Sequence, residues 1–203
     1  AGLTIQEPTN VEPRGSGTVG DLGLWDNKFI PGLKRCVDFI RLHNSVPGIQ
    51  LGHSGRKARR FRPWEGGAPL KQTPEIDDWD QWELVSSSGI NSPDTDPTPR
   101  ALTLAEIPEA VERWGQAARR AHEAGFDVLD IHMAHGYLIH QFLSPFSNVR
   151  NDQYGGSELN RMRFAIEVVE SVRAHWPASK PLFVRLSVGD DSAWWPGPSA
   201  APS

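Results

Sequence analysis

The sequence predicts an α/β fold in which helices pack against a parallel sheet, either an open doubly wound sheet or a barrel. Two features of the chain support this prediction. Short apolar segments alternate with amphipathic helical segments, and the helical segments carry start and stop signals at their ends. A length of 203 residues suits one domain with a single sizeable core.

The first part of the chain contains a strand, a helix and a strand. Residues 3–5 alternate apolar and polar side chains before a loop rich in Pro and Gly, which indicates a weak strand end. Residues 27–44 predict an amphipathic helix. Its apolar face consists of Ile30, Leu33, Cys36, Val37 and Ile40. "PGIQLGHSG" at residues 47–55 is a brief apolar run closed by glycines and predicts a buried strand.

A long irregular segment separates this unit from the next one. Residues 59–100 are rich in Pro, Gly, Ser, Asp and Trp and show little periodicity. Long segments of this kind within a compact domain are usually functional or disordered. The sequence therefore predicts an excursion from the α/β core over these residues.

The second part of the chain adds a helix, a strand, a helix and a strand. "TLAE" at residues 103–106 is a capping box that opens a helix running to about Glu123, and Gly125 is its stop signal. The three remaining segments are, in chain order, "FDVLDIH", "SELNRMRFAIEVVESVRAHW" and "PLFVRLSV". Their alternation between strand and helix patterns completes the predicted parallel sheet.

Two segments have features of a phosphate-binding loop. The basic cluster "GRKARRFR" at residues 55–62 lies among acidic stretches, so we interpret it as a solvated loop. The alternative is that part of it contacts an anionic cofactor. "YGGS" at residues 154–157 lacks the spacing of the dinucleotide and P-loop motifs. We interpret it as a turn with Ser157 as the N-cap of the following helix.

Composition narrows the class of protein. The formal net charge of -4 argues against nucleic-acid binding by overall attraction, so small molecules are the expected partners. No apolar run is long enough for a membrane span, and no signal-peptide pattern is visible. The single cysteine, Cys36, fits a reducing compartment, so a cytoplasmic protein is expected. Association with another copy of the chain is left open.

Polar side chains gather where the three clearest strands end. In order along the chain they are Gln50, His53, His132, His135, Arg185 and Ser187. Ligands of α/β proteins bind at this edge of the sheet because side chains from several strands converge there. Arginine is almost never buried without a partner, so Arg185 either meets a ligand or forms a structural ion pair.

The histidine pair admits three interpretations. His132 and His135, with His140 nearby, could bind a metal, but an offset of three residues places them on opposite faces of a strand unless the strand ends between them. Either one alone could simply pack and bond to the backbone. Together with Tyr137 they form a set suited to polarising a carbonyl or nitro oxygen and protonating a carbon atom.

Three stretches of the chain resemble the Old Yellow Enzyme family of flavin-dependent ene-reductases, especially its bacterial NADPH dehydrogenase branch. They are "IQLGHSGRKA", "AGFDVLDIHMAHGYLIHQFLSPFSNVRNDQYGGSELNRMRF" and "FVRLSVGD". The resemblance runs from about residue 3 to residue 190. It implies a (β/α)8 TIM barrel that holds FMN at the carboxyl ends of its strands.

The resemblance also implies roles for five side chains. His132 and His135 would hydrogen-bond the carbonyl or nitro oxygen of an activated alkene, and Tyr137 would protonate its α-carbon. Gln50 would contact the pyrimidine edge of the flavin. Arg185 would lie beside the N1 and C2 carbonyl region, where a cation stabilises the reduced flavin. NADPH would supply the hydride to the flavin, which passes it to the β-carbon.

Relative to that family the barrel pattern is incomplete. The chain begins near the second strand and its pattern stops at Asp190, so we expect about strands 2 to 5 of the barrel. The family's phosphate-binding loops follow its last strands. We therefore expect a partial FMN-binding barrel domain at residues 1–190 and an unrelated, Pro-rich, disordered tail at residues 191–203.

The favoured function is an FMN-dependent oxidoreductase that uses NADPH to reduce enones, nitroalkenes or quinone-like compounds. A non-catalytic product is the first alternative: either a truncated, catalytically inactive form of such an enzyme or a binding module that keeps the pocket edge without flavin. The Pro-rich tail, which looks foreign to the fold, favours it. A histidine metalloenzyme is the second alternative, and it requires an acidic or cysteine ligand close to His132 and His135.

Overall fold

Four parallel strands form the main sheet of the protein. The structure, a computed structural model, describes residues 1–72, 79–91 and 97–188. The strands lie in the order β1-β2-β5-β6, and every neighbouring pair is parallel. Their bounds are β1 Leu3–Asn10, β2 Val46–Gly52, β5 Val128–Met133 and β6 Leu182–Leu186. The predicted α/β fold with four barrel strands is confirmed.

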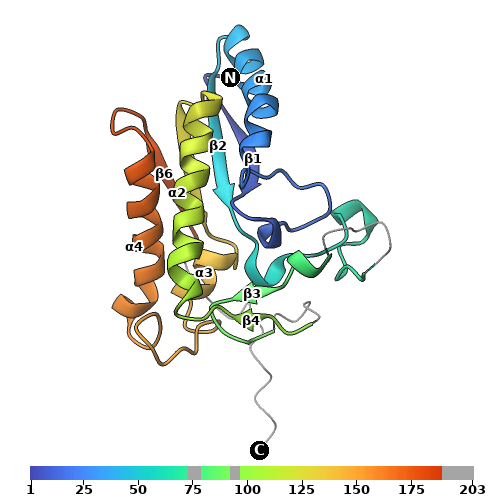
Figure 1. Ribbon diagram of the computed structural model, residues 1–203, viewed down its shortest axis with the longest axis vertical. Helices are drawn as coiled ribbons and strands as arrows, with labels where there is room; N and C mark the ends of the chain where they lie inside the picture. The colour runs from blue at the N-terminus through green and yellow to red at the C-terminus, as the bar shows by residue number, and fades with distance from the viewer. Residues whose placement is uncertain (73–78, 92–96, 189–203) are drawn as a thin grey trace, which may run out of the picture.

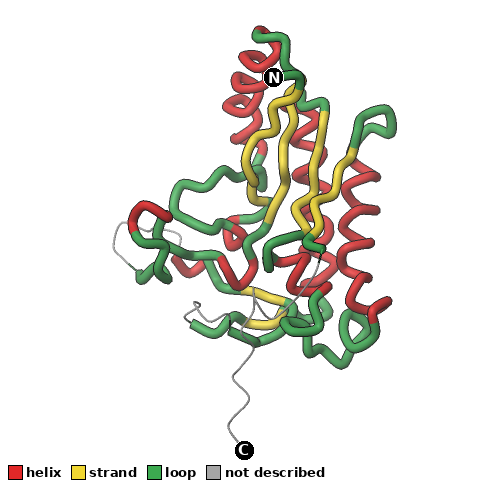
Figure 2. Tube along the Cα trace, turned by 180° about the vertical axis from the view of Figure 1, so that it is seen from behind, coloured by secondary structure: helices red, strands yellow, loops and turns green. Residues whose placement is uncertain are grey.

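Three long helices cover one face of this sheet (Figure 1). They are α1 Ile30–Leu42, α2 Glu106–Ala124 and α4 Glu158–His175. Seen from behind, the other face of the strands is bare within the part of the chain that the structure describes (Figure 2). This arrangement is that of half a (β/α)8 barrel, in which helices lie outside and the strands face the barrel interior.

The predicted helix signals operate as expected. The Thr103 hydroxyl accepts a hydrogen bond from the backbone N–H of Glu106 (3.3 Å), and the Glu106 carboxylate accepts one from the backbone N–H of Thr103 (2.8 Å). Gly125 ends α2 with φ 97°, a left-handed conformation that glycine adopts without strain. The Ser157 hydroxyl caps α4 by accepting from the N–H of Asn160 (3.3 Å).

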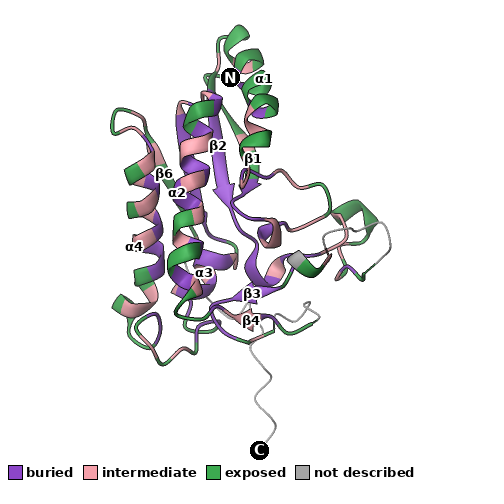
Figure 3. Ribbon diagram, viewed as in Figure 1, coloured by how far each residue is buried: buried purple, intermediate pink, exposed green. Residues whose placement is uncertain are grey.

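The core lies between the sheet and the helices. The two central strands, β2 and β5, are almost entirely buried, whereas the edge strands β1 and β6 are mostly exposed (Figure 3). The largest fully buried side chains are Trp114, Trp176, Phe126, Phe142 and Phe164. Each such aromatic or aliphatic side chain stabilises the fold by about 1.5–3 kcal/mol through its removal from water.

Several elements differ from the expectation. β1 is a full strand of eight residues rather than a weak strand end. The long irregular segment contains a short parallel pair, β3 Val85–Ser86 and β4 Arg100–Ala101. A short helix, α3 Leu138–Leu143, was not predicted. Turns of 3₁₀ helix occur at Pro13–Gly15, Asn27–Phe29, Gly55–Lys57, Pro63–Glu65 and Trp79–Gln81.

The expected apolar face of α1 is only partly correct. Leu33 and Val37 are buried, but Cys36 is exposed. Ile30 and Ile40 lie between these extremes. Among the described residues, α1 lies at the edge of the helical layer, where it packs mainly against β2 and α2. A narrower stripe therefore suffices to anchor it.

The interpretation of residues 55–62 as a solvated loop is wrong. Arg56 and Arg59 are 4% and 9% exposed. The Arg59 guanidinium lies 4.4 Å from the ring centre of Trp79, and Arg56 Nη1 donates to the carbonyl of Ile90 (3.3 Å). The segment after β3 and the Trp-containing loop cover these arginines, so their long side chains pack as well as carry charge.

Within the described residues, no helix is both long and apolar enough to cross a membrane. The predicted tail at residues 191–203 lies outside the described part of the chain.

Candidate active site

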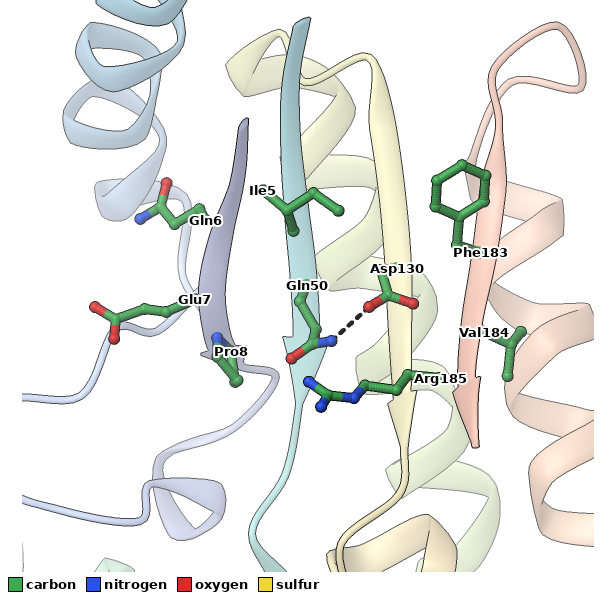
Figure 4. Close-up of a pocket in the computed structure, with 9 residues that line it drawn as sticks. All are labelled: Ile5, Gln6, Glu7, Pro8, Gln50, Asp130, Phe183, Val184 and Arg185. Atoms are coloured by element: carbon green, nitrogen blue, oxygen red, sulfur yellow. Dashed lines mark hydrogen bonds between the residues drawn. The ribbon is translucent and has the colours of Figure 1, made fainter. Parts of the chain in front are cut away.

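The register of the central strands brings two polar side chains together on the open face of the sheet. β2 pairs with β5 so that Gln50 stands opposite Asp130. The Gln50 side-chain amide donates a hydrogen bond to the Asp130 carboxylate, drawn as a dashed line in Figure 4. Both side chains are buried, at 6% and 8% exposed. The remaining lone pairs of the Gln50 carbonyl oxygen are thus left to accept a bond from another partner.

Arg185 extends over the same face from the neighbouring strand. It stands on β6 opposite His132 of β5, and its guanidinium points toward Gln50 and Asp130 (Figure 4). The three side chains line a cavity of about 620 Å³, whose far wall is β1 from Ile5 to Pro8. Arg185 forms no ion pair with any residue that the structure describes. A cation therefore faces this cavity.

The predicted histidine–tyrosine cluster is present at the carboxyl end of β5. The ring of His132 lies 4.9 Å from that of His135 and 4.9 Å from that of Tyr137, measured between ring centres. The rings of His135 and Tyr137 are 6.4 Å apart. His132 is on the strand, whereas His135 has a left-handed backbone with φ 59° just beyond it. The strand therefore ends between the two histidines, as their spacing required.

The protonation state of His132 is fixed by its surroundings. Its Nδ1 accepts a hydrogen bond from the backbone N–H of Ala134 (3.1 Å), so the proton of the neutral ring is on Nε2. Burial, assisted by the positive charges of His135, Arg185 and His140, lowers the pKa of His132 to about 4. At neutral pH this residue is consequently a neutral donor through Nε2–H.

The other two rings of the cluster, those of His135 and Tyr137, are also uncharged near neutral pH. Burial and the charges of Arg185 and Lys57 lower the pKa of the His135 imidazole, although this side chain is largely exposed. Burial raises the pKa of the Tyr137 phenol, with Asp21 acting in the same direction and Arg185 opposing. Near neutral pH the cluster therefore offers two neutral imidazoles and a protonated phenol.

His53 does not join this cluster, although it also follows a strand end. Its Nε2 bonds to the Glu12 carboxylate (2.8 Å), and its Nδ1 accepts from the backbone N–H of Gly55 (2.9 Å). Both side chains are buried. The other strand-end residue, Ser187, accepts a hydrogen bond from the backbone N–H of His135 (3.0 Å) and so supports the cluster from β6.

The metal interpretation gains no support. The described residues contain no group of three or more His, Cys, Asp and Glu side chains arranged to hold a metal ion. His140 instead accepts a hydrogen bond at Nδ1 from the backbone N–H of Gly136 (2.7 Å).

Two residues of the site carried no role in the sequence-based prediction. Asp130 stands two residues before His132, so the period of a strand places it on the same face, and this signal was available. Gln141 is fully buried and bonds to the loop that carries His135. Its contacts come from the fold of distant segments, for which no local pattern exists.

The segment after α3 has a structural function. Asn148 donates to the backbone carbonyls of Phe142 and Tyr154, both at 2.7 Å. Arg150 donates to the carbonyls of Ser87 (2.8 Å) and Leu102 (2.7 Å). These bonds join α3, the β3–β4 pair and the turn before α4, so much of the distinctive "NVRNDQYGGS" stretch serves to hold loops together.

Fold and site together define a protein of the (β/α)8-barrel class with its functional side chains at the carboxyl ends of the strands. The model of the NADH:flavin oxidoreductase / NADH oxidase family matches residues 1–200. The chain belongs to this family, which is the Old Yellow Enzyme family that its sequence resembles.

Individual relatives are similar over nearly the whole chain. An NADPH dehydrogenase of Geobacillus thermodenitrificans is 43% identical over 93% of this chain. One of Bacillus subtilis is 41% identical over the same share. Among solved structures, morphinone reductase has a TM-score of 0.78 at 33% identity over 92% of this chain. An Old Yellow Enzyme homologue from Zymomonas mobilis has a TM-score of 0.75 at 31% identity over 92%.

The chain spans about half the length of these relatives: 49% of both dehydrogenases and 50% of both structures. The four strands and three long helices are accordingly about half of a (β/α)8 barrel.

The donors and acceptors of the cavity fit the ring system of a flavin. An amide carbonyl oxygen with free lone pairs and a guanidinium without an ion partner among the described residues lie side by side, at Gln50 and Arg185. A flavin ring edge carries an N–H donor between two carbonyl acceptors, so it offers partners to both.

Proposed function

We propose that this chain forms the substrate-binding half of an FMN-dependent oxidoreductase that uses NADPH to reduce activated alkenes. Enones, nitroalkenes and quinone-like compounds are the substrate class. The observation that carries the proposal is the cluster of His132, His135 and Tyr137, in which one imidazole is fixed as a neutral donor beside a protonated phenol. Relatives named NADPH dehydrogenase support the choice of reductant.

Gln50 and Arg185 would hold the flavin. The Gln50 carbonyl oxygen, which is not used by the amide bond to Asp130, would accept from a flavin ring N–H, and the Arg185 guanidinium would stabilise the negative charge of the reduced flavin. Bound FMN would supply the redox chemistry: it accepts a hydride from NADPH and returns a hydride to the β-carbon of the alkene.

His132 and His135 would bind the activating oxygen of the substrate. The Nε2–H of His132 and an imidazole N–H of His135 donate to the carbonyl or nitro oxygen, which draws electron density from the alkene. Negative charge develops on this oxygen as the β-carbon receives hydride. Neutral donors suit the task because they stabilise that charge without transferring a proton to the oxygen.

Tyr137 would complete the reduction by protonating the α-carbon. The O–H bond of the phenol breaks, a C–H bond forms, and the electron pair stays on the phenolate oxygen. Burial raises the pKa of Tyr137, and the charge of Arg185 partly opposes this rise and so favours the phenolate. Solvent then returns the proton to Tyr137.

The test is to titrate the purified 203-residue chain with FMN, follow the visible flavin spectrum and fluorescence, and then add NADPH and an enone without oxygen. We expect a flavin band that NADPH bleaches and the enone restores. A chain that binds FMN but shows neither change is the catalytically inactive form of the enzyme. A chain that leaves the FMN spectrum and fluorescence unchanged contradicts the cofactor site.

A further inference from the structure

The short segment His135–Gly136 connects the two ends of the ring cluster. Both residues have left-handed backbones, with φ 59° at His135 and 70° at Gly136. A residue with a side chain keeps this conformation only when its surroundings impose it. His132 lies before the segment and Tyr137 after it. The conformation of His135–Gly136 therefore decides where the rings of His135 and Tyr137 stand relative to that of His132.

Side chains from outside the segment bond to all four of its backbone polar groups. The His135 N–H donates to Ser187 Oγ (3.0 Å), the His135 carbonyl accepts from Lys57 Nζ (2.7 Å), the Gly136 N–H donates to His140 Nδ1 (2.7 Å), and the Gly136 carbonyl accepts from Gln141 Nε2 (2.7 Å). Loops usually satisfy such groups with water or with their own backbone. A complete set of side-chain bonds indicates a segment held in one position.

Gln141 is the member of this set that lies deepest in the protein. It is 0% exposed. Its Nε2 also donates to the carbonyl of Ser54 (3.3 Å), and its Oε1 accepts from the backbone N–H of Arg56 (3.3 Å). One side-chain amide thus joins the loop after β5 to the loop after β2. These are the loops that follow the strands bearing His132 and Gln50.

The surroundings leave space for this amide. A Cβ atom added at Gly55 would lie 2.4 Å from Gln141 Oε1 and 2.6 Å from its Nε2. The absence of a side chain at Gly55 is therefore what allows the amide to sit between the two loops.

We propose that Gln141 is a positioning residue for the reaction: its amide holds the Gly136 carbonyl and thereby sets the separation of the rings of His132, His135 and Tyr137. The inference deepens the proposed function and rests on it for its catalytic meaning. The part of the proposal that concerns ring positions depends only on the protein chain and can be tested without flavin or substrate. A buried amide is costly unless its groups are bonded, and all three side-chain bonds of this one go to the two loops of the site.

The test is to replace Gln141→Met, which fills similar volume without donors or acceptors, and to record NMR spectra of the flavin-free chain. In the parent we expect ring-to-ring nuclear Overhauser contacts between His132 and both neighbours. In the variant we expect these contacts and the mutual ring-current shifts to be lost, while the circular dichroism spectrum and the resonances of His175 are unchanged. Gln116→Met is the matched control, because it removes a half-buried amide on α2 that bonds to Glu112, Arg119 and His175 and not to the loops of the site. It should leave the ring contacts of the cluster intact, whatever it does to the His175 resonances.

A folded Gln141→Met chain that keeps the ring contacts overturns the proposal. Gln141→Glu, of the same shape but with an acceptor facing the Gly136 carbonyl, is the second variant, and loss of the contacts in it counts equally in favour. If neither variant folds, Gln141 supports the fold rather than the loop and the proposal is wrong. These NMR spectra are recorded without flavin, so they test the role of Gln141 separately from the proposed function. If the chain is inactive as a reductase but its ring contacts depend on Gln141, only the proposed function is contradicted.

Discussion

His132 illustrates how single atoms determine what the site can do. Its Nδ1 is occupied by the N–H of Ala134, so Nε2 carries the only proton of the neutral ring. The low pKa of about 4 keeps the ring in this form at neutral pH. The residue therefore presents a donor, and not a base, to whatever oxygen lies above the cluster.

Replacing Tyr137→Phe tests the proton donor. We expect re-oxidation of the reduced enzyme by an enone to slow by about 10²-fold or more, because a positioned general acid is lost. Reduction by NADPH requires no proton from Tyr137, so its rate should change little. Stopped-flow absorbance of the flavin band measures both half-reactions separately.

Tyr154→Phe is the matched control for this experiment. Tyr154 is the second of the chain's 2 tyrosines, and its hydroxyl bonds to Glu167 on α4, away from the cluster. Both half-reactions should keep parental rates in this variant. Equal slowing in the two variants would mean that Tyr137 acts through the fold and not as an acid.

The same burial that neutralises His132 should make the fold sensitive to mild acid. Because the pKa is 6.5 in the unfolded chain and about 4 in the folded one, the unfolded state binds the extra proton between these values. Stability is then full above pH 6.5 and falls as pH decreases toward 4, by about 3 kcal/mol at most.

Urea unfolding at pH 7 and pH 4.5 measures this loss in the parent and in His132→Asn, whose amide does not titrate. We expect the decrease to be smaller in the variant. His43→Asn, a change at the exposed C-cap of α1, should behave like the parent. A parent whose midpoint is the same at both pH values contradicts the low pKa of His132.

Among the helices, the contact between α2 and α4 depends on one missing side chain. A Cβ atom at Gly115 would lie 2.4 Å from Ser171 Oγ and 2.7 Å from His175 Nδ1. Gly115→Ala should therefore destabilise the protein by about 1–3 kcal/mol, even though alanine is the better helix former. Chemical unfolding monitored by circular dichroism measures the change.

Gly32 offers the opposite case on α1. Nothing lies within 4 Å of a Cβ atom built there, and its φ is not in the left-handed range. Gly32→Ala should stabilise the chain by about 0.5–1 kcal/mol, because only the helix propensity changes. Opposite changes in the free energy of unfolding for these two Gly→Ala substitutions would separate the effect of packing from that of helix propensity. If both substitutions stabilise the protein, the close approach of α2 and α4 is contradicted.

These elements also show why sequence predicted some of the structure and missed the rest. The α2 helix was predicted because its capping box and its Gly125 stop signal are both local signals. The α3 helix is only six residues long and has four of them buried, so it offers no amphipathic period to detect. The β3–β4 pair consists of two residues in each strand and is stabilised by Arg150 from a distant segment.

The candidate site divides in the same way. His132, His135, Tyr137, Gln50 and Arg185 could be selected because they follow strand ends, and the carboxyl edge of a parallel sheet is one place in space. The bond between Gln50 and Asp130 depends on strand register, and the contacts of Gln141 depend on how two loops fold over α3. Such contacts are tertiary and leave no periodic trace in the chain.

The open face of the sheet governs the behaviour of the molecule as a whole. Parallel sheets are normally covered on both faces, yet here Ile5 and Phe183 are 42% and 45% exposed beside the cavity. Closure of a barrel would cover this face and place Gln50, Asp130 and Arg185 in its interior. The acid–base cluster, at the strand ends, would then lie at the mouth of the barrel.

A buried ionic network holds the amino-terminal strand to this sheet. The Glu12 carboxylate bonds to His53 Nε2 (2.8 Å) after β2, to Arg14 Nε (2.8 Å) and to Arg113 Nη1 (2.7 Å) on α2. Burial by itself would raise the pKa of Glu12, but the bond from His53 and the charges of its three partners outweigh it and hold the pKa at about 2. The network therefore connects three parts of the fold through one charge.

Acid should weaken the Glu12 network in a lower pH range than the one in which His132 is protonated. The folded pKa of Glu12 lies below its unfolded value of 4.5, so its stabilisation is full above pH 4.5 and is lost as pH falls toward 2. Glu12→Gln should cost about 3 kcal/mol at pH 7, because the neutral amide leaves the partner charges uncompensated. The difference between variant and parent should then shrink steadily below pH 4.5, since the parent loses the same charge by protonation.

Urea unfolding of both proteins at pH 7, 4.5 and 3 measures this convergence. Glu109→Gln is the control: its exposed carboxylate lies 3.9 Å from the same Arg113, and a solvent-exposed pair of this kind contributes little at any pH. A Glu12→Gln deficit that stays constant from pH 7 to pH 3 would mean that the carboxylate stabilises the fold by its shape and hydrogen bonds alone. A deficit that shrinks with acid, while Glu109→Gln remains near the parent, would establish that charge joins β1 to the rest of the sheet.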